Sequence, residues 1–328
     1  MNIGLLLVLL LVLGAEFTNG LTDAANAIAT VIGMRVLSPI KAVIMAAVLN
    51  MVGVLVTGTA VATTIGKDIV RPEVITLESL AAAMFTVIAW MVAARFFNIP
   101  TSATYVLLAG LAGAGLATAG SSALLWDGWR KVLMGLVVST VVGFGLAFII
   151  MIIIYWLFRH AQRPTAGRLF QRLQIVSAGF LAFSHGSNDG QKFMGVFTLA
   201  LVLGGVIPNF HVQTWVVFLC SAVMAVGAGI GGWRVTKTKR LTKAKLEPVN
   251  AFVAETAASI SILASSVFGI PLSTTHTIGT AIMGVGVTNR LSAVNWGVCR
   301  QIVITWLLTF PACLILGYLF TWLFKLIF

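Results

Sequence analysis

The sequence has very few charged side chains and no long polar stretch in which a soluble domain could fold. Only 9% of its 328 residues are charged, whereas 59% are hydrophobic, and soluble domains carry about 25% charged residues. In water, this composition would leave large apolar patches exposed. It therefore excludes a water-soluble enzyme, a soluble nucleic-acid binder and a disordered scaffold, and it is typical of a polytopic helical membrane protein.

Cysteine and acidic residues are equally scarce. Cys220, Cys299 and Cys313 lie in apolar segments without metal-ligand spacing, so we expect buried thiols, no disulfide framework and no structural metal. Nine acids against 21 Lys and Arg give a net charge of +12. In a membrane protein this excess belongs to cytoplasmic loops, so no nucleic-acid partner is expected. Residues 1–14 lack a basic start, which favours a retained first span over a signal peptide.

About ten apolar blocks follow one another along the chain. They lie near 3–34, 40–65, 79–97, 99–119, 131–158, 173–207, 212–233, 249–268, 270–288 and 296–328. Block 173–207 would measure about 52 Å as one straight helix, longer than a hydrocarbon core of about 30 Å. We therefore expect it to be broken at the polar cluster 185–189, and block 3–34 at the cluster 19–23. Such breaks are tolerated only inside protein or beside a watery cavity.

An internal repeat relates the two halves. Residues 17–23 (Phe-Thr-Asn-Gly-x-x-Asp) align with 183–189 (Phe-Ser-His-Gly-x-x-Asp), 99–104 (Ile-Pro-x-Ser-x-Thr) with 270–275, and Trp126-x-x-x-Arg130 with Trp296-x-x-x-Arg300. The three matches occur in the same order and at nearly the same offset. The sequence therefore predicts a first transmembrane repeat over 1–158, a basic cytoplasmic linker over 159–172 and a second transmembrane repeat over 173–328.

Loop charge predicts how the repeats are oriented. The linker carries four arginines and no acid, and the loop 234–247 carries six Lys and Arg against one Glu. Both should be cytoplasmic, which places both termini outside a multi-pass plasma-membrane protein and inverts one repeat relative to the other. Inverted repeats with broken helices are typical of secondary transporters. The expected fold is thus all-α, with two inverted-topology repeats, broken helices and, around Pro100 and Pro271, either full spans or re-entrant hairpins.

Five ionisable residues lie within or beside apolar blocks: Glu16, Asp23, Asp189, Lys192 and Glu255. Each unpaired charge at a helix centre costs about 2.5–3.5 kcal/mol on insertion scales, so these groups must be paired, hydrated or bound to ions. One interpretation is that Asp23 and Asp189 only cap broken helices, with Asp189 neutralised by Lys192. The duplication of the aspartates favours a central site shared by both halves.

The two proline segments predict an anion site. Proline is favoured in the first turn of a helix, where free backbone N–H groups and the positive end of the helix dipole attract anions. The hydroxyls that follow belong to Ser102, Thr104, Ser273, Thr274 and Thr275. Such residues also permit close helix packing, but two copies beside two aspartates favour ion-coupled anion transport.

Three motifs carry a resemblance to a known family: residues 19–30 (NGLTDAANAIAT), 185–192 (HGSNDGQK) and 269–276 (GIPLSTTH). Over essentially its whole length, the chain resembles the bacterial branch of the inorganic phosphate transporter (PiT) family. The resemblance implies a phosphate symporter. Its coupling cation would bind at Asp23, Asn26, Asn188 and Asp189. Its phosphate would bind at Ser102, Thr104, Gln191, Lys192, Ser273, Thr274 and Thr275.

Lys192 is a departure from the sodium-coupled relatives, which carry an asparagine at this position. A fixed ammonium could replace one bound sodium ion, so protons are slightly favoured over sodium as the coupling ion, and no other cofactor is expected. His185, Glu255 and His276 are candidate proton carriers, since imidazole titrates near neutrality. A histidine at a packed interface is also often a plain hydrogen-bonding group.

The predicted function is import of inorganic phosphate by alternating access. A permease for sulfate or a related oxyanion on the same scaffold is the alternative. An enzyme is disfavoured because the chain has no nucleophile-elbow serine and no His-Glu-x-x-His, and a channel because binding groups occur in both halves. Phosphate and the lipid bilayer are the expected partners. The sequence leaves open whether phosphate travels as a metal complex and whether the protein is a homodimer.

Overall fold

The computed structural model describes residues 3–24, 26–97, 99, 101–237, 247–289, 291 and 296–327. The side chains of residues 24, 26, 163, 233–237, 289, 298, 299, 301 and 302 lie outside the description. Pro100 and most of the basic loop predicted at 234–247 therefore lie outside the described residues, as do the side chains of Asn26 and Cys299. The other two cysteines, Cys220 and Cys313, are free and buried, as expected.

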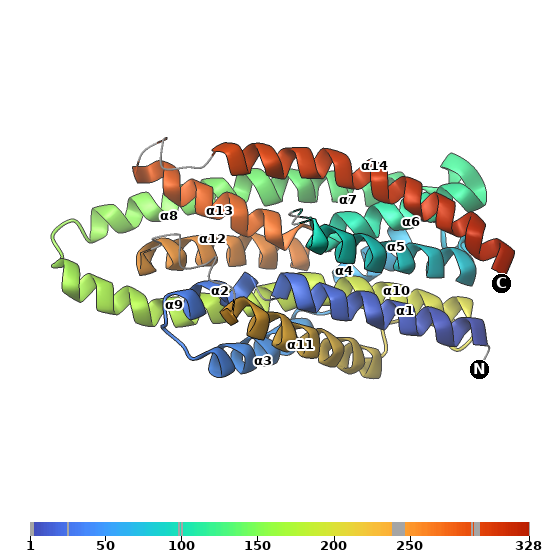
Figure 1. Cartoon of the computed structure of the whole chain (residues 1–328), viewed down its shortest axis with the longest axis horizontal. Helices are drawn as coiled ribbons and strands as arrows, with labels where there is room; N and C mark the ends of the chain where they lie inside the picture. Colours follow the sequence, from blue (N-terminus) through green and yellow to red (C-terminus); the bar gives the residue numbers. More distant parts are fainter. Residues whose placement is uncertain are drawn as a thin grey trace.

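The described residues are helical almost throughout and include no strand (Figure 1). The α-helices are α1 (Ile3–Asn19), α2 (Asn26–Gly33), α3 (Pro39–Thr57), α4 (Ala60–Thr63), α5 (Leu77–Phe96), α6 (Ala103–Ala119), α7 (Trp126–Val137), α8 (Gly143–Leu157), α9 (Arg163–His185), α10 (Gln191–Leu203), α11 (Thr214–Lys237), α12 (Pro248–Val267), α13 (Thr274–Asn289) and α14 (Trp296–Ile327). Single π-helical turns form η1 (Gly20–Ala24), η2 (Thr64–Asp68), η5 (Val138–Val142) and η6 (Gly186–Gly190), and 3₁₀ turns form η3 (Pro72–Val74) and η4 (Gly120–Ala123). Eight of the described helical stretches are long and apolar enough to cross a membrane, which confirms an all-α polytopic membrane protein.

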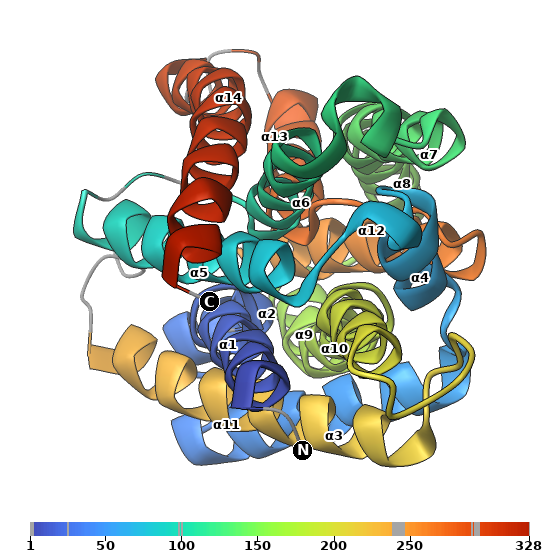
Figure 2. The ribbon, with the colours of Figure 1, turned by 90° about the vertical axis from the view of Figure 1, so that its right-hand side faces the viewer.

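The two expected breaks fall on π-helical turns. η1 follows α1 and η6 joins α9 to α10, at the two polar clusters that the sequence singles out. A π-turn widens the helix while keeping most backbone groups hydrogen-bonded, which suits a polar segment at membrane depth. In the end-on view of Figure 2, α9 and α10 lie one behind the other, as two parts of one long path.

The two interrupted helices run in opposite directions. In Figure 1, the α1–α2 path starts at the end of the molecule that carries both termini, whereas the α9–α10 path finishes there. This is the arrangement that inverted repeats predict. The α8–α9 connection lies at the opposite end (Figure 1). Residues 163–172, predicted as linker, belong to α9, which has a proline in its first turn. The repeat boundaries and the assignment of the two ends to outside and cytoplasm stay predictions.

Two helix pairs approach the middle from opposite ends. α5 and α6 occupy one half of the molecule, and α12 and α13 occupy the other half (Figure 1). Their inner ends meet, because the Thr104 hydroxyl at the start of α6 donates to the carbonyl of Leu272, just before α13, at 3.0 Å. Of the two arrangements that the sequence allowed, this one corresponds to re-entrant hairpins. We call α5–α6 the first hairpin and α12–α13 the second.

Two apolar cores flank a polar middle. One core joins α1, α5, α6, α10 and α11, and the other joins α2, α3, α8, α9, α12 and α13. Close backbone packing fixes the polar turns between them. A Cβ on Gly20 of η1 would lie 2.3 Å from the carbonyl oxygen of Met224 on α11, and one on Gly186 of η6 would lie 2.0 Å from that of Asn50 on α3. The two glycines are equivalent positions of the repeat, and only a residue without a side chain fits either.

Candidate functional site

Lys192 joins the three elements that meet in the middle of the molecule. Its side chain is 1% exposed and pairs with the carboxylate of Asp189 in η6. Its ammonium also donates to the Thr104 hydroxyl of the first hairpin at 2.6 Å and to the Leu272 carbonyl of the second at 2.8 Å. An ammonium has three N–H donors, so all of its hydrogen-bonding capacity is used.

Asp189 is surrounded by donors. Besides Lys192, the Thr274 hydroxyl at the start of α13 donates to its Oδ2 at 2.8 Å. The Nε2 of His185 lies 3.3 Å from the same oxygen. These partners come from α9, α10 and the second hairpin, so Asp189 does more than cap a helix: it holds the hairpin to the interrupted helix.

His185 has a second partner that fixes its tautomer. Its Nδ1 lies 2.8 Å from the Oδ1 of Asn50, whose amide nitrogen donates to the carbonyl of Ala46. The amide oxygen accepts, so Nδ1 of His185 carries a proton. Its Nε2 lies 3.3 Å from the Oδ2 of Asp189 and, among the described residues, has no hydrogen-bond partner. His185 therefore lies between α3 and η6, with one ring nitrogen at each.

Asn188 and Gln191 have different surroundings from those that the resemblance implies. The Asn188 amide donates to the Ser266 hydroxyl and to the Ile270 carbonyl, both at 3.1 Å, and its Oδ1 accepts from the backbone N–H of Leu272 at 3.3 Å. It thereby ties η6 to the inner end of the second hairpin. The Gln191 Oε1 accepts from the backbone N–H of Val61 at 2.9 Å and so caps α4. Their roles toward cation and phosphate stay predictions.

Asp23 in η1 faces the same region from the other repeat. It is 6% exposed, lies within electrostatic range of Asp189, His185 and Lys192, and has the Thr275 hydroxyl as its polar neighbour. The structure thus brings together the two duplicated aspartates, as the sequence predicts. Asn26, the other expected cation ligand of this half, begins α2 and has a side chain outside the described part.

The hydroxyls expected to bind phosphate lie at two converging helix starts. Ser102 is the N-cap residue of α6 and is 2% exposed, and its hydroxyl does not cap its own helix. Ser273 precedes α13, where its hydroxyl accepts from the backbone N–H of His276 at 3.3 Å. Both helix starts therefore direct their positive dipole ends at the middle of the molecule, next to the ammonium of Lys192.

His276 and Glu255 have partners of their own. The indole N–H of Trp306 donates to Nε2 of His276, and the imidazole stacks on the ring of Tyr105 with centroids 5.1 Å apart. This ring nitrogen accepts, so His276 is neutral in this arrangement. Glu255 on α12 accepts hydrogen bonds from the hydroxyls of Thr30 and Ser177, which connects the second hairpin to α2 and α9.

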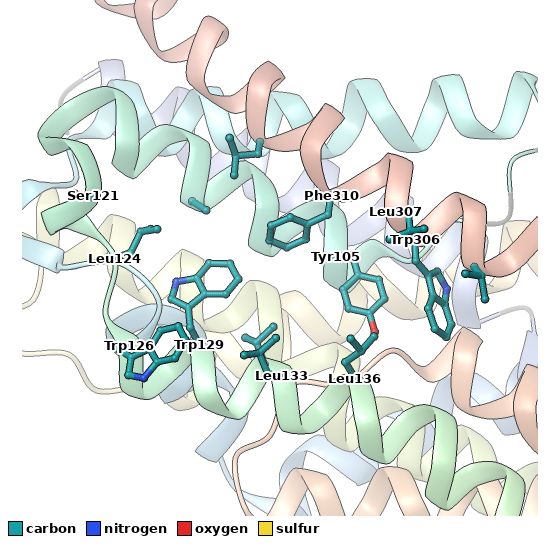
Figure 3. A pocket seen from close by; sticks show the side chains of 14 residues that line it. Tyr105, Ser121, Leu124, Trp126, Trp129, Leu133, Leu136, Trp306, Leu307 and Phe310 are labelled. Carbon is teal, nitrogen blue, oxygen red and sulfur yellow. The ribbon is translucent and has the colours of Figure 1, made fainter.

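A cavity of about 670 Å³ lies beside the site, between α6, α7 and α14 (Figure 3). Tyr105 and Trp306 stand at one end of it, and Trp126 and Trp129 stand at the other. Its lining is almost wholly apolar, so it offers nothing that would replace the hydration of a phosphate ion. Within the described ranges, no group of three or more His, Cys, Asp or Glu could hold a metal ion.

Sequence reasoning missed Asn50, Ser266, Tyr105 and Trp306 as neighbours of the site. Asn50 is an isolated polar residue in an apolar segment, whereas Ser266 follows Ser265 in a serine-containing apolar segment, so only Asn50 stood out in the sequence. Their partners lie 135 and 78 residues away along the chain, so the sequence could not show what they hold.

Comparisons with known proteins agree with this architecture. Residues 19–317 match the model of the phosphate transporter family. The chain is 41% identical over 303 residues to a probable low-affinity inorganic phosphate transporter of Rhizobium meliloti, covering 92% of this chain and 91% of that one. It is 38% identical to a protein of the same description from Bacillus subtilis, over the whole of both chains.

A solved structure has the same fold. It is described as the sodium-dependent phosphate transporter, and it superposes with a TM-score of 0.88 at 23% identity over the full length of both chains. The relatives and the fold are those of transporters and not of enzymes. Since the family model covers most of the sequence and both bacterial relatives align over nearly all of it, the chain belongs to the phosphate transporter family.

Proposed function

We propose that the protein imports inorganic phosphate across the plasma membrane by alternating access, in symport with a cation. The observation that carries this proposal is the set of contacts of Lys192, whose ammonium joins Asp189 to the inner ends of both hairpins. A fixed positive charge, two helix starts and several hydroxyls then stand at one point shared by the two repeats.

Phosphate would bind where the two hairpins meet. The starts of α6 and α13 supply N–H groups and positive dipole ends, which favour anions. Ser102, Thr104, Ser273, Thr274 and Thr275 supply hydroxyl donors, and Lys192 supplies the charge. These groups fit an oxyanion with several acceptor oxygens.

The coupling cation would bind on the Asp23 side. Asp189 already has Lys192 as a counter-ion in direct contact. Among the described side chains, the one at hydrogen-bonding range of Asp23 is the Thr275 hydroxyl, and a second carboxylate, Asp189, lies within electrostatic range. A buried carboxylate without a counter-ion is costly at membrane depth, so Asp23 binds a proton or a sodium ion, and protons are slightly favoured. The ion's binding would lower the cost of bringing phosphate next to Asp23, which is the coupling that a symporter needs.

Alternating access would use the same contacts. Opening toward one end separates the first hairpin from Lys192, and opening toward the other separates the second. Because each hairpin reaches the middle from its own end (Figure 1), the two movements open the site to opposite sides. The burial of Asp189, Lys192, Ser102 and Ser273 supports an occluded state between the two movements.

A sulfate carrier is the alternative, and protonation distinguishes the two anions. Hydrogen phosphate can donate a hydrogen bond to a carboxylate such as Asp23, whereas sulfate has no proton to donate at neutral pH. Phosphate is therefore the better partner for a site that contains acceptors, and the relatives described as phosphate transporters support it.

The test is uptake of radiolabelled phosphate into proteoliposomes under a proton gradient alone and a sodium gradient alone. We expect accumulation under at least one gradient, and competition by excess phosphate but not by excess sulfate. Asp23→Asn should remove accumulation, while Asp127→Asn, at an exposed carboxylate, should not. Equal uptake without any gradient would contradict symport, and equal competition by sulfate would contradict phosphate selectivity. Repeating the uptake with and without divalent metal tests whether phosphate travels as a metal complex.

A further inference from the structure

Glu16 is a buried carboxylate outside the phosphate and cation site described above. It lies on α1, one turn before η1, and its side chain is 0% exposed. Among the described residues, no donor lies in hydrogen-bonding geometry with either of its oxygens, and the amide of Asn19, its nearest polar neighbour, is also unpartnered. An unpaired, unhydrated carboxylate at membrane depth is strongly disfavoured, so a positive charge must accompany it.

Among the side chains that the structure describes, none near Glu16 supplies that charge. Lys192 lies within electrostatic range, but its three donors are taken by Asp189, Thr104 and Leu272. Asp189, the other charged group in range, repels a second carboxylate.

The helices packed against α1 do not supply it either. From α11 the titratable neighbour is the thiol of Cys220. On α5, the charged residues Glu78 and Arg95 stand at the two ends of the helix, near its first and last turns. The positive charge must therefore come from a bound cation.

A proton fits this place better than a metal ion. A metal cation takes several oxygen ligands at once, whereas Asn19 is the one side chain that the described part of the chain brings to hydrogen-bonding range of Glu16. A protonated carboxyl needs one acceptor, and the Oδ1 of Asn19, one turn along the same helix, is free to accept from it. A single proton would then give one carboxyl oxygen of Glu16 and the Oδ1 of Asn19 a hydrogen-bond partner.

We propose that Glu16 is a proton-binding site of the transport cycle, separate from Asp23 and Asp189, with Asn19 as its hydrogen-bond acceptor. The inference rests on the proposed phosphate symport and names one of its coupling ions. α1 begins at the terminus-bearing end of the molecule (Figure 1), and Glu16 stands in its last turn, next to η1. When that end opens, its carboxylate takes one proton from water. When the other end opens and phosphate leaves, it returns that proton to water.

Lys192 and Asp189 would link this proton to phosphate. When phosphate binds beside Lys192, the ammonium interacts with both phosphate and Asp189. Its positive charge then neutralises the carboxylate of Asp189 less fully. Glu16, within electrostatic range of both, then holds its proton more tightly. Reciprocity requires that a proton on Glu16 strengthens phosphate binding by the same factor.

The experiment compares Glu16→Gln, which imitates the protonated carboxyl, with Glu73→Gln, the same change at an exposed position. Both are reconstituted in proteoliposomes with the voltage held at zero, and phosphate exchange is measured beside accumulation driven by a pH gradient. Each coupled proton supports about tenfold accumulation per pH unit. We expect Glu16→Gln to keep phosphate exchange, but its phosphate accumulation should be about tenfold lower than that of wild type for each pH unit of the gradient. Glu73→Gln should match wild type in both measurements.

Two further measurements decide the remaining outcomes. Adding phosphate to purified wild-type protein in weak buffer should cause proton uptake that Glu16→Gln lacks and that Glu16→Asp, which keeps a carboxyl, retains. This comparison stands even if Glu16→Gln folds poorly. Accumulation and proton uptake in Glu16→Gln equal to wild type would overturn the inference, as would a change in sodium dependence alone. Wild-type protein without phosphate exchange would instead overturn the proposed function.

Discussion

The two π-helical turns carry the same Gly-x-x-Asp motif, but their carboxylates have different neighbours. Asp189 in η6 is held by Lys192, Thr274 and the imidazole of His185, whereas Asp23 in η1 has the Thr275 hydroxyl as its polar neighbour. Asp189 is thus saturated by the protein itself, whereas Asp23 has no counter-ion in direct contact among the described side chains, which is why we propose it as the cation site. An exchangeable ion can bind only where the protein leaves a charge uncompensated.

The largest effect should come from breaking the saturated half. Lys192→Asn leaves Asp189 without its counter-ion at 1% exposure, and breaking a buried pair costs about 3–5 kcal/mol. We expect a large fall in melting temperature, together with loss of transport or a new dependence on sodium. The double variant Lys192→Asn/Asp189→Asn should recover much of the melting temperature but not proton-driven uptake. A single variant as stable as wild type, with unchanged uptake, would show that Asp189 does not depend on this charge.

Asp23→Asn changes the other half and should separate transport from stability. Removing a charge that no protein cation neutralises should leave the melting temperature unchanged or higher, since an uncompensated buried carboxylate is costly. Driven phosphate uptake should be abolished because the coupling ion loses its ligand. The measurement is a melting curve beside gradient-driven uptake. A strong loss of stability in Asp23→Asn would mean that η1 is a structural support like η6.

The hydroxyls at the two hairpins should contribute to phosphate binding from both repeats. Ser102→Ala and Ser273→Ala each remove a donor from an anion that is largely desolvated, at about 1–3 kcal/mol. Converted from free energy to a ratio of dissociation constants, this loss means that phosphate affinity should fall about 5- to 150-fold, while cation affinity changes less. Equilibrium binding of labelled phosphate to purified protein measures this, with Ser122→Ala, at an exposed turn, as the control. Unchanged affinity in both variants would make these residues packing groups.

Sequence reasoning reached the elements of the site but not the partners of each side chain. The pairing of Asp189 with Lys192 follows from their spacing of three on a helix, and the two polar clusters were identified because they interrupt apolar blocks. That the interruptions are π-turns does not follow, because unwound backbone and π-turns contain the same polar residues. The partners of Asn188 and Gln191 do not follow either, because Ser266 and Val61 lie 78 and 130 residues away along the chain. Only the folded chain brings them together.

The smallest effect should come from loosening the inner end of the second hairpin. Ser266→Ala removes an acceptor of the Asn188 amide and of the Ser187 hydroxyl, which keep the carbonyls of Ile270 and Ser184 as acceptors. A neutral hydrogen bond contributes about 0.5–1.5 kcal/mol, and both donors keep a partner, so a slightly lower melting temperature is expected. Because the bond ties the second hairpin to η6, the same change should favour the conformation open toward the end opposite the termini. A cysteine placed at the inner end of this hairpin should then react faster with a permeant thiol reagent, and unchanged reactivity would show that Asn188 holds the hairpin without Ser266.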